Sequence, residues 1–162
     1  MDRLLRWLSP LLAMGMLAGC TGSGLVGDGV PKPVRSVLFG HRDGGAVIEG
    51  WLLVAQLKTE CSDIGATLEG NHDPGESIWI LAERGATQGW EGLYPGTAAA
   101  APGDAEARHA EVYFRQAGDV AVLTGDDAWV RLISHEEDGL VKAELGTSLA
   151  EGLLIADECG AF

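Results

Sequence analysis

The sequence predicts an all-β fold, an antiparallel sandwich or barrel of roughly eight or nine short strands. Three observations predict this class. Short runs of β-branched and aromatic residues show period-two alternation, turn signals separate these runs at intervals of about ten residues, and only one segment has a helical pattern. The predicted strands span 35–41, 46–55, 77–82, 89–94, 110–115, 120–123, 129–134, 140–145 and 149–155.

The first half of the chain contains strong turn signals between apolar runs. Segments 35–41 and 46–55 flank an Asp-Gly-Gly sequence, and two apolar runs joined in this way predict a β-hairpin. Segment 77–82 is rich in β-branched and aromatic residues, and segment 89–94 ends at a Pro-Gly turn pair. The alanine-rich stretch 97–104 contains proline and glycine, so we expect a loop there.

One segment, 62–68, is the candidate helix. Ser62 stands where a cap is expected, because its hydroxyl can accept a hydrogen bond from a first-turn amide. Gly65 weakens the helix by about 1 kcal/mol relative to alanine. We therefore expect no more than one short helix near 62–68.

The last third of the chain alternates most clearly. A Gly-Asp turn separates 110–115 from 120–123, and a Gly-Asp-Asp turn follows the second of these strands. Segment 129–134 places charged residues on one face, and a Glu-Asp-Gly hairpin signal leads to 140–145. The closing strand, 149–155, ends shortly before Cys159.

The N-terminus carries a targeting signal. An apolar run begins after Arg3 and Arg6 and ends in small residues, which is typical of a secretory signal peptide. Its end, Leu17-Ala18-Gly19-Cys20, resembles the lipobox of bacterial lipoproteins. The resemblance implies that residues 1–19 are removed and that Cys20 becomes a lipidated N-terminus in the bacterial cell envelope. Thr21 stands where an Asp commonly retains such proteins at the inner membrane, so the outer membrane is favoured.

These features divide the chain into three parts. An uncleaved anchor helix at 1–19 is disfavoured, because a membrane span needs about 20 apolar residues and Pro10 interrupts this run. The glycine-rich segment 20–32 is expected to be a flexible tether, and 33–162 a single β-domain. Residues 22–27 match the letters of a dinucleotide-binding motif, but no strand and helix flank them.

Two cysteines remain after Cys20. An even pair in an exported chain predicts a disulfide between Cys61 and Cys159, and the alternative is two separate buried thiols. The early cysteine, a Gly-Leu-Tyr turn at 92–94 and a late Gly-Leu-Leu-Ile-Ala-Asp-Glu-Cys strand also resemble small β-rich bacterial surface lipoproteins of unassigned function. That resemblance likewise implies that the two cysteines pair.

The chain is strongly acidic, with a formal net charge of −13 at pH 7. Such a charge repels phosphate backbones and makes a nucleic-acid partner unlikely on electrostatic grounds. It gives no attraction to anionic lipids, so membrane attachment has to come from the acyl chains. A soluble surface explains most of this charge, and binding of a cation or a basic partner is the alternative.

The sequence contains no recognisable catalytic or metal motif. No two histidines have the i, i+4 spacing of a zinc helix, and the turn clusters at 71–73 and 135–138 do not match a calcium loop. No serine of the domain stands on a glycine-flanked elbow after a strand. A thiol site at Cys61 or Cys159 would be abolished by the disulfide. We therefore predict no catalytic residue, no metal site and no cofactor.

The tryptophans are the remaining candidates for recognition. Trp51, Trp79 and Trp129 lie in predicted strands, and we expect them in the core. Trp90 lies between Gly89 and Glu91, so its ring, together with that of Tyr94, is the candidate contact for a partner.

The predicted function is a non-enzymatic binding or structural role at the envelope. The partners are the membrane, through the N-terminal lipid, and an unidentified protein or small molecule. One alternative is an exported hydrolase that acts on envelope or extracellular material. Another is a lipocalin-like carrier of a small apolar ligand, which requires a hollow barrel.

Overall fold

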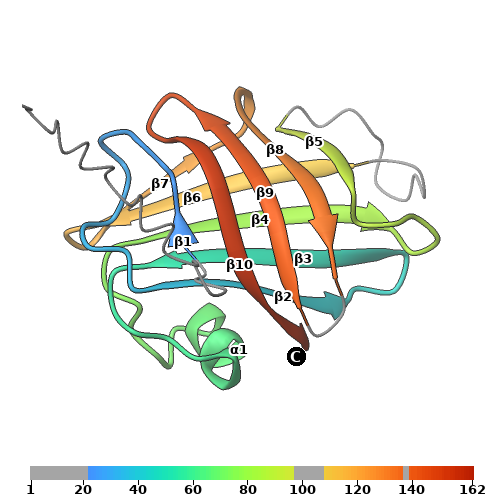
Figure 1. Cartoon of the computed structure of the whole chain (residues 1–162), viewed down its shortest axis with the longest axis horizontal. Coiled ribbons are helices and arrows are strands. Elements are labelled where there is room, and N and C mark those ends of the chain that lie inside the picture. The colour runs from blue at the N-terminus through green and yellow to red at the C-terminus, as the bar shows by residue number, and fades with distance from the viewer. Residues whose placement is uncertain (1–21, 97–107, 137–138) are drawn as a thin grey trace, which may run out of the picture.

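The computed structural model describes residues 22–96, 108–136 and 139–162, and it confirms the all-β prediction (Figure 1). Most of this part of the chain forms a single β-sheet, beside one short helical segment. The strands are β1 (Gly22–Ser23), β2 (Ser36–Asp43), β3 (Val47–Ala55), β4 (Ser77–Gly85), β5 (Gly92–Gly96), β6 (His109–Gln116), β7 (Asp119–Leu123), β8 (Gly125–His135), β9 (Leu140–Thr147) and β10 (Glu151–Ala161).

The sheet is nearly closed into a barrel. Its strand order is β5-β8-β9-β10-β2-β3-β4-β6-β7, and β1 is added at β10. Strands β8, β9 and β10 cross in front of β2, β3, β4 and β6 at a steep angle, and both β5 and β8 contact β6 (Figure 1). The expectation of a purely antiparallel sheet is wrong in one place, because β10 and β2 pair in parallel. This pair joins the end of the chain to its first long strand.

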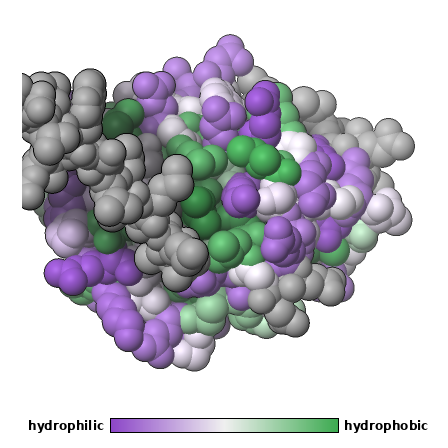
Figure 2. All heavy atoms as spheres, in the orientation of Figure 1, coloured by the Kyte–Doolittle hydropathy of each residue, from purple (hydrophilic) through white to green (hydrophobic). Residues whose placement is uncertain are grey.

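The barrel interior is filled with apolar side chains. Period-two alternation points Phe39, Leu52, Ile80, Val112 and Leu154 inward from five different strands, and all five are fully buried. Outside the barrel, hydrophilic residues surround apolar side chains that gather over β9 and β10, where Leu153 is 42% exposed (Figure 2).

The helical segment lies where the sequence predicts it. A 3-10 turn, η1 (Cys61–Asp63), leads into α1 (Ile64–Leu68). The predicted cap is wrong by two residues: Glu60, not Ser62, begins the turn, and its amide donates to Asp63 Oδ2 at 3.3 Å. Ile64 is fully buried against Leu38 and Leu53, so the helix covers a second, smaller core on the outside of the sheet.

The disulfide between Cys61 and Cys159 is confirmed. It joins η1 to β10 across 98 residues of sequence, with a Cα–Cα distance of 5.1 Å. Cys159 lies within β10 rather than beyond its end, because β10 continues to Ala161 alongside β2.

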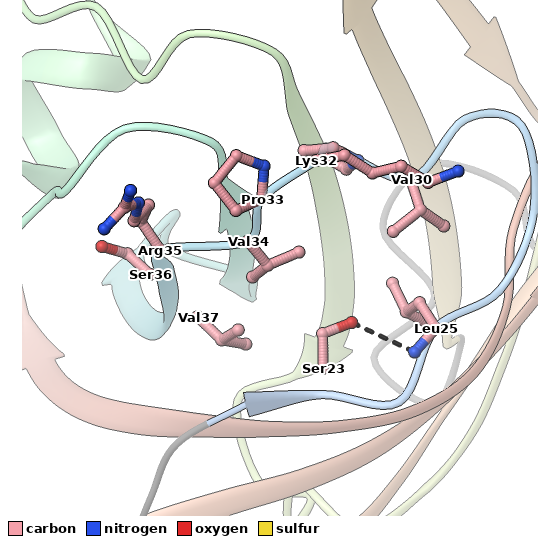
Figure 3. Close-up of a pocket in the computed structure, with 10 residues that line it drawn as sticks. Ser23, Leu25, Val30, Lys32, Pro33, Val34, Arg35, Ser36 and Val37 are labelled. Atoms are coloured by element: carbon pink, nitrogen blue, oxygen red, sulfur yellow. Dashed lines mark hydrogen bonds between the residues drawn. The ribbon is translucent and has the colours of Figure 1, made fainter.

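The described part of the expected tether, residues 22–32, lies against the barrel instead of standing free. The Gly24 amide donates to Leu153 O at 2.8 Å, and Val26 exchanges two 2.9 Å backbone hydrogen bonds with Glu151. Leu25 and Val30 are buried in the main core, and Val34, which precedes β2, packs against the same core (Figure 3). The glycines that predicted flexibility instead allow close approach to β10.

Gly27 illustrates this close approach. Its φ is +134°, and a Cβ there would lie 2.2 Å from the Leu149 carbonyl oxygen. Only glycine fits this position, which lets the described residues 22–32 pack closely against the barrel.

Two turn predictions have different outcomes. The Gly-Asp-Asp sequence that begins at Gly125 is the start of β8 rather than a turn, and the β5–β8 register shifts there. The loop expected at 97–104 lies outside the described residues.

Candidate functional site

The described barrel has an open recess of about 440 Å³ that is lined by polar and charged side chains. It lies where four inward-facing side-chain rows end. In β2 the row is Val37, Phe39 and then His41, and in β10 it is Leu154, Ala156 and then Glu158. The residues that line it are His41, Arg84, Gly89, Trp90, Glu91, His135, Glu158 and Gly160.

Glu158 is the central group of this recess. Its side chain is only 3% exposed, and its Oε2 lies 2.8 Å from His135 Nε2 while its Oε1 lies 3.7 Å from His41 Nδ1. The Gly160 amide donates to Oε1 at 2.8 Å. Burying a carboxylate is costly unless charge or hydrogen bonds compensate it, and the two imidazoles lie where they can supply that compensation.

The polar atoms of this group are not fully satisfied. The 2.8 Å contact between His135 and Glu158 is an ion-pair distance without hydrogen-bond angles, so His135 Nε2 and Glu158 Oε2 lack a hydrogen-bond partner. His41 Nδ1 and Arg84 Nε also lack one. Four inaccessible polar atoms around one recess are unusual, because buried polar groups are nearly always paired.

Trp90 forms the apolar wall of the recess. The Arg84 guanidinium carbon lies 4.2 Å from the ring centroid, a cation–π contact. Arg84 Nη1 donates to the carbonyls of Gly85, at 3.0 Å, and Gln88. Burial lowers the pKa of the Arg84 guanidinium, which nevertheless stays a cation at neutral pH.

The Trp90 ring is held by close packing. The Phe39 ring meets it edge-on at 5.2 Å, and the His41 and His135 rings lie at 5.9 and 6.1 Å. On the β3 side, a Cβ at Gly50 would lie 2.6 Å from the Trp90 ring. The absence of a side chain at Gly50 therefore makes room for the indole.

The expectation that Trp90 and Tyr94 are held out from the sheet is wrong. Trp90 is 5% exposed and Tyr94 is fully buried, with its hydroxyl donating to the Trp90 carbonyl at 2.7 Å. Burial raises the pKa of Tyr94 to about 12. The flanking glycines let the chain turn so that both rings enter the barrel, where Trp90 lines the recess from inside.

The other tryptophans do not enter the barrel interior, although Trp79 packs against the smaller outer core. Trp51, Trp79 and Trp129 are partly exposed on the outer face of the sheet. In β3 the inward row is Gly50, Leu52 and Val54, so alternation sends Trp51 outward.

The remaining sequence candidates do not meet in one site. Asp73 accepts the Gly75 amide at 3.0 Å and pairs with Arg115 at 3.2 Å, whereas His135 lies in the recess. Cys20 and residues 137–138 lie outside the described residues. Within the described ranges, no group of three or more His, Cys, Asp or Glu side chains is arranged to hold a metal ion.

Comparison with known proteins supplies no relative. No protein-family model, no curated protein and no solved structure matches this chain. Between residues 22 and 162, leaving aside 97–107 and 137–138, there is no helix with the length and apolar character to cross a membrane.

The recess contains groups that can bind and groups that can move a proton. A carboxylate beside an imidazole is the arrangement of a general base, and Arg84 provides a fixed cation. No serine, threonine or cysteine is among the described residues that line the recess. Among the side chains that line it, the carboxylates and the imidazoles are the groups that can act as base or nucleophile.

Proposed function

We propose that this protein is a lipid-anchored protein of the bacterial cell envelope, attached to the outer membrane through Cys20, with a non-enzymatic binding role. The lipobox-like sequence supports the anchor. In this proposal the recess around Glu158 binds a small polar ligand. The filled barrel interior argues against a lipocalin-like carrier, which needs an apolar cavity.

The observation that carries the binding role is the buried carboxylate of Glu158 between two histidines. A carboxylate in the lining of a recess of this size favours a ligand that donates hydrogen bonds, such as an amine or a polyol. The Trp90 ring beside it offers an apolar surface to the body of the same ligand.

The binding proposal is tested with Glu158→Gln, which keeps the size of the side chain and removes its charge. Glu151→Gln is the matched control, because Glu151 is an exposed residue of the same strand. Among small amines and polyols, we expect at least one to raise the thermal midpoint of the wild type and the control but not of Glu158→Gln. A panel with no effect on the wild type, or with equal effects on all three proteins, contradicts the proposal.

The second candidate function is that of a hydrolase. The contact between His135 and Glu158 favours it, because this pair can serve as the base that activates water. The same three proteins separate the two functions. Turnover of generic ester, peptide or glycoside substrates by the wild type and Glu151→Gln, but not by Glu158→Gln, would establish the enzyme and displace the binding role.

The anchor is tested separately with Cys20→Ala. We expect this variant to leave the membrane fraction and to keep residues 1–19, because lipidation precedes signal cleavage in the family that the lipobox resembles. Thr21→Ala, one residue further, should remain membrane-bound and mature. A Cys20→Ala protein that still matures and stays with the membrane would contradict the lipid anchor.

A further inference from the structure

A second surface of the molecule, on the outer face of β3, β4 and β6, carries three neighbouring aromatic rings. Trp51, Trp79 and Tyr113 come from adjacent strands, and Trp79 lies opposite Tyr113 in the β4–β6 register. The Trp51 ring centroid lies 6.2 Å from that of Trp79 and 6.2 Å from that of Tyr113. We call these three residues the aromatic cluster.

The aromatic cluster forms the floor of an open groove of about 530 Å³. Thr67 and Leu68 of α1 line it on one side, and Val120 of β7 lines it on another. Val120 and Val122, which lies opposite Tyr113, are 62% and 50% exposed. Large apolar side chains left this exposed next to three rings are typical of an interaction site.

Carboxylates border the aromatic cluster. Glu49 Oε2 accepts the Trp51 indole N–H at 3.3 Å, and Glu111 accepts the hydroxyl of Tyr113. Glu83 lies opposite Glu49 in the β3–β4 register. Burial, and to a lesser extent the charges of Glu49 and Glu111, raise the pKa of Glu83 against the opposing effect of His109.

The positive charges nearby are already paired. Arg42 Nε lies 2.6 Å from Glu49, and Arg115, which lines the groove, lies 3.2 Å from Asp73. The three carboxylates Glu49, Glu83 and Glu111 lie beside the aromatic cluster rather than in the lining of the groove, and Arg42 and His109 pair with two of them. The excess of negative charge is local as well as global, since the whole chain carries −13.

The ring geometry suits a cationic group. Trp51 and Trp79 meet at 79° and form a corner, and the Tyr113 ring is tilted by 31° from that of Trp51. A corner of aromatic faces, each with a negative quadrupole, surrounds a cationic group well. The hydrogen bonds from Trp51 and Tyr113 to carboxylates increase the electron density of both rings, which strengthens this attraction.

We propose that the groove binds a basic segment of a partner polypeptide, with an Arg or Lys side chain packed against the exposed faces of the aromatic cluster. The aliphatic stem of such a side chain would lie along the apolar wall at Leu68 and Val120, and its charged head would reach the rings and carboxylates. This site shares no residue with the recess around Glu158, so it does not depend on the function proposed above.

The experiment uses a short oligoarginine peptide as the probe, with titration calorimetry at physiological salt. Trp51→Leu removes a ring without changing the charge, and Glu111→Gln removes a charge without removing a ring. Trp129→Leu and Glu144→Gln are the matched controls, because Trp129 is also partly exposed and Glu144 is also in an ion pair, with Arg131 at 3.6 Å where Glu111 has His109 at 3.5 Å. Circular dichroism checks that each variant is folded.

We expect Trp51→Leu and Glu111→Gln each to weaken oligoarginine binding about tenfold, and the two controls to change it less than twofold. An oligoglutamate peptide of the same length should not bind. Equal affinity for all variants would mean nonspecific attraction to an acidic protein and would overturn the proposal. Absence of oligoarginine binding, or binding of a neutral oligosaccharide in its place, would overturn it too.

Discussion

Of the two tyrosines of this chain, Tyr94 is fully buried and Tyr113 is partly buried. Burial raises the pKa of each phenol to about 12, and for Tyr113 the hydrogen bond to Glu111 adds to the effect. A free tyrosine titrates near pH 10. The folded state therefore holds these protons more tightly than the unfolded state, which stabilises the protein below about pH 10. This contribution is lost as the pH rises through 12.

An ultraviolet absorbance titration checks this prediction. We expect little tyrosinate near pH 10 and its appearance near pH 12, together with alkaline unfolding in the circular dichroism signal. Tyr113→Phe should leave one phenol with the same late titration. A phenol that ionises near pH 10 while the protein is still folded would contradict the burial of that ring.

Single residues also show how much of the recess could be predicted from the sequence. His41, Arg84 and Glu158 each follow an inward row of apolar residues in their strands, such as Ile78, Ile80 and Ala82 before Arg84. That alternation is visible in the sequence and marks these polar residues as inward-facing. Their meeting is not visible there, because it depends on how distant strands are ordered in the sheet.

At the scale of elements, alternation located every long strand but could not decide which face of β3 is buried. Ile48, Leu52 and Val54 lie on one face, and Trp51 and Leu53 on the other. Both faces are apolar because α1 covers Leu53 outside the barrel, and so Trp51 could not be assigned to a face from its sequence neighbours.

The N-terminal segment gives the prediction at this scale. A variant that begins at residue 33 lacks the buried side chains Leu25 and Val30 and the backbone pairing with β10. Each buried aliphatic side chain contributes about 1.5–3 kcal/mol, so we expect this variant to unfold about 3–5 kcal/mol more easily than one that begins at residue 22. Urea denaturation of the two variants measures the difference.

Two details make this comparison decisive. Both variants lack residues 1–21, so signal and lipid affect neither. Leu25→Ala in the longer variant should reproduce part of the loss of stability, because it removes the buried side chain but keeps the backbone hydrogen bonds of Gly24 and Val26. Equal denaturation midpoints for the two truncated variants would restore the interpretation of residues 22–32 as a free tether.

At the scale of the whole molecule, both ends of the chain meet on β10. The described N-terminal segment pairs, through β1, with the first half of β10. The second half of β10 pairs in parallel with β2. Residue 20 is two residues from the start of β1, and an extended chain spans at most about 3.6 Å per residue. If Cys20 is lipidated, the barrel therefore lies directly at the membrane surface, and its long strands hold both ends in place.

The disulfide tests how far this arrangement depends on a covalent link. Cys61–Cys159 closes a loop of 98 residues that contains β4, β5, β6, β7, β8 and β9. Constraint of the unfolded chain predicts a contribution of about 4–5 kcal/mol for such a loop, and small secreted domains commonly lose 2–5 kcal/mol without a native disulfide. We expect the double variant Cys61→Ser/Cys159→Ser to unfold at a clearly lower urea concentration, with a steeper slope because the unfolded chain without the link exposes more surface. Reductant should produce the same loss in the wild type and none in the double variant.

The main core contains neither cysteine, so the barrel should remain folded in dilute buffer. Identical midpoints with and without reductant would mean that the β10–β2 pairing closes the sheet without the covalent link.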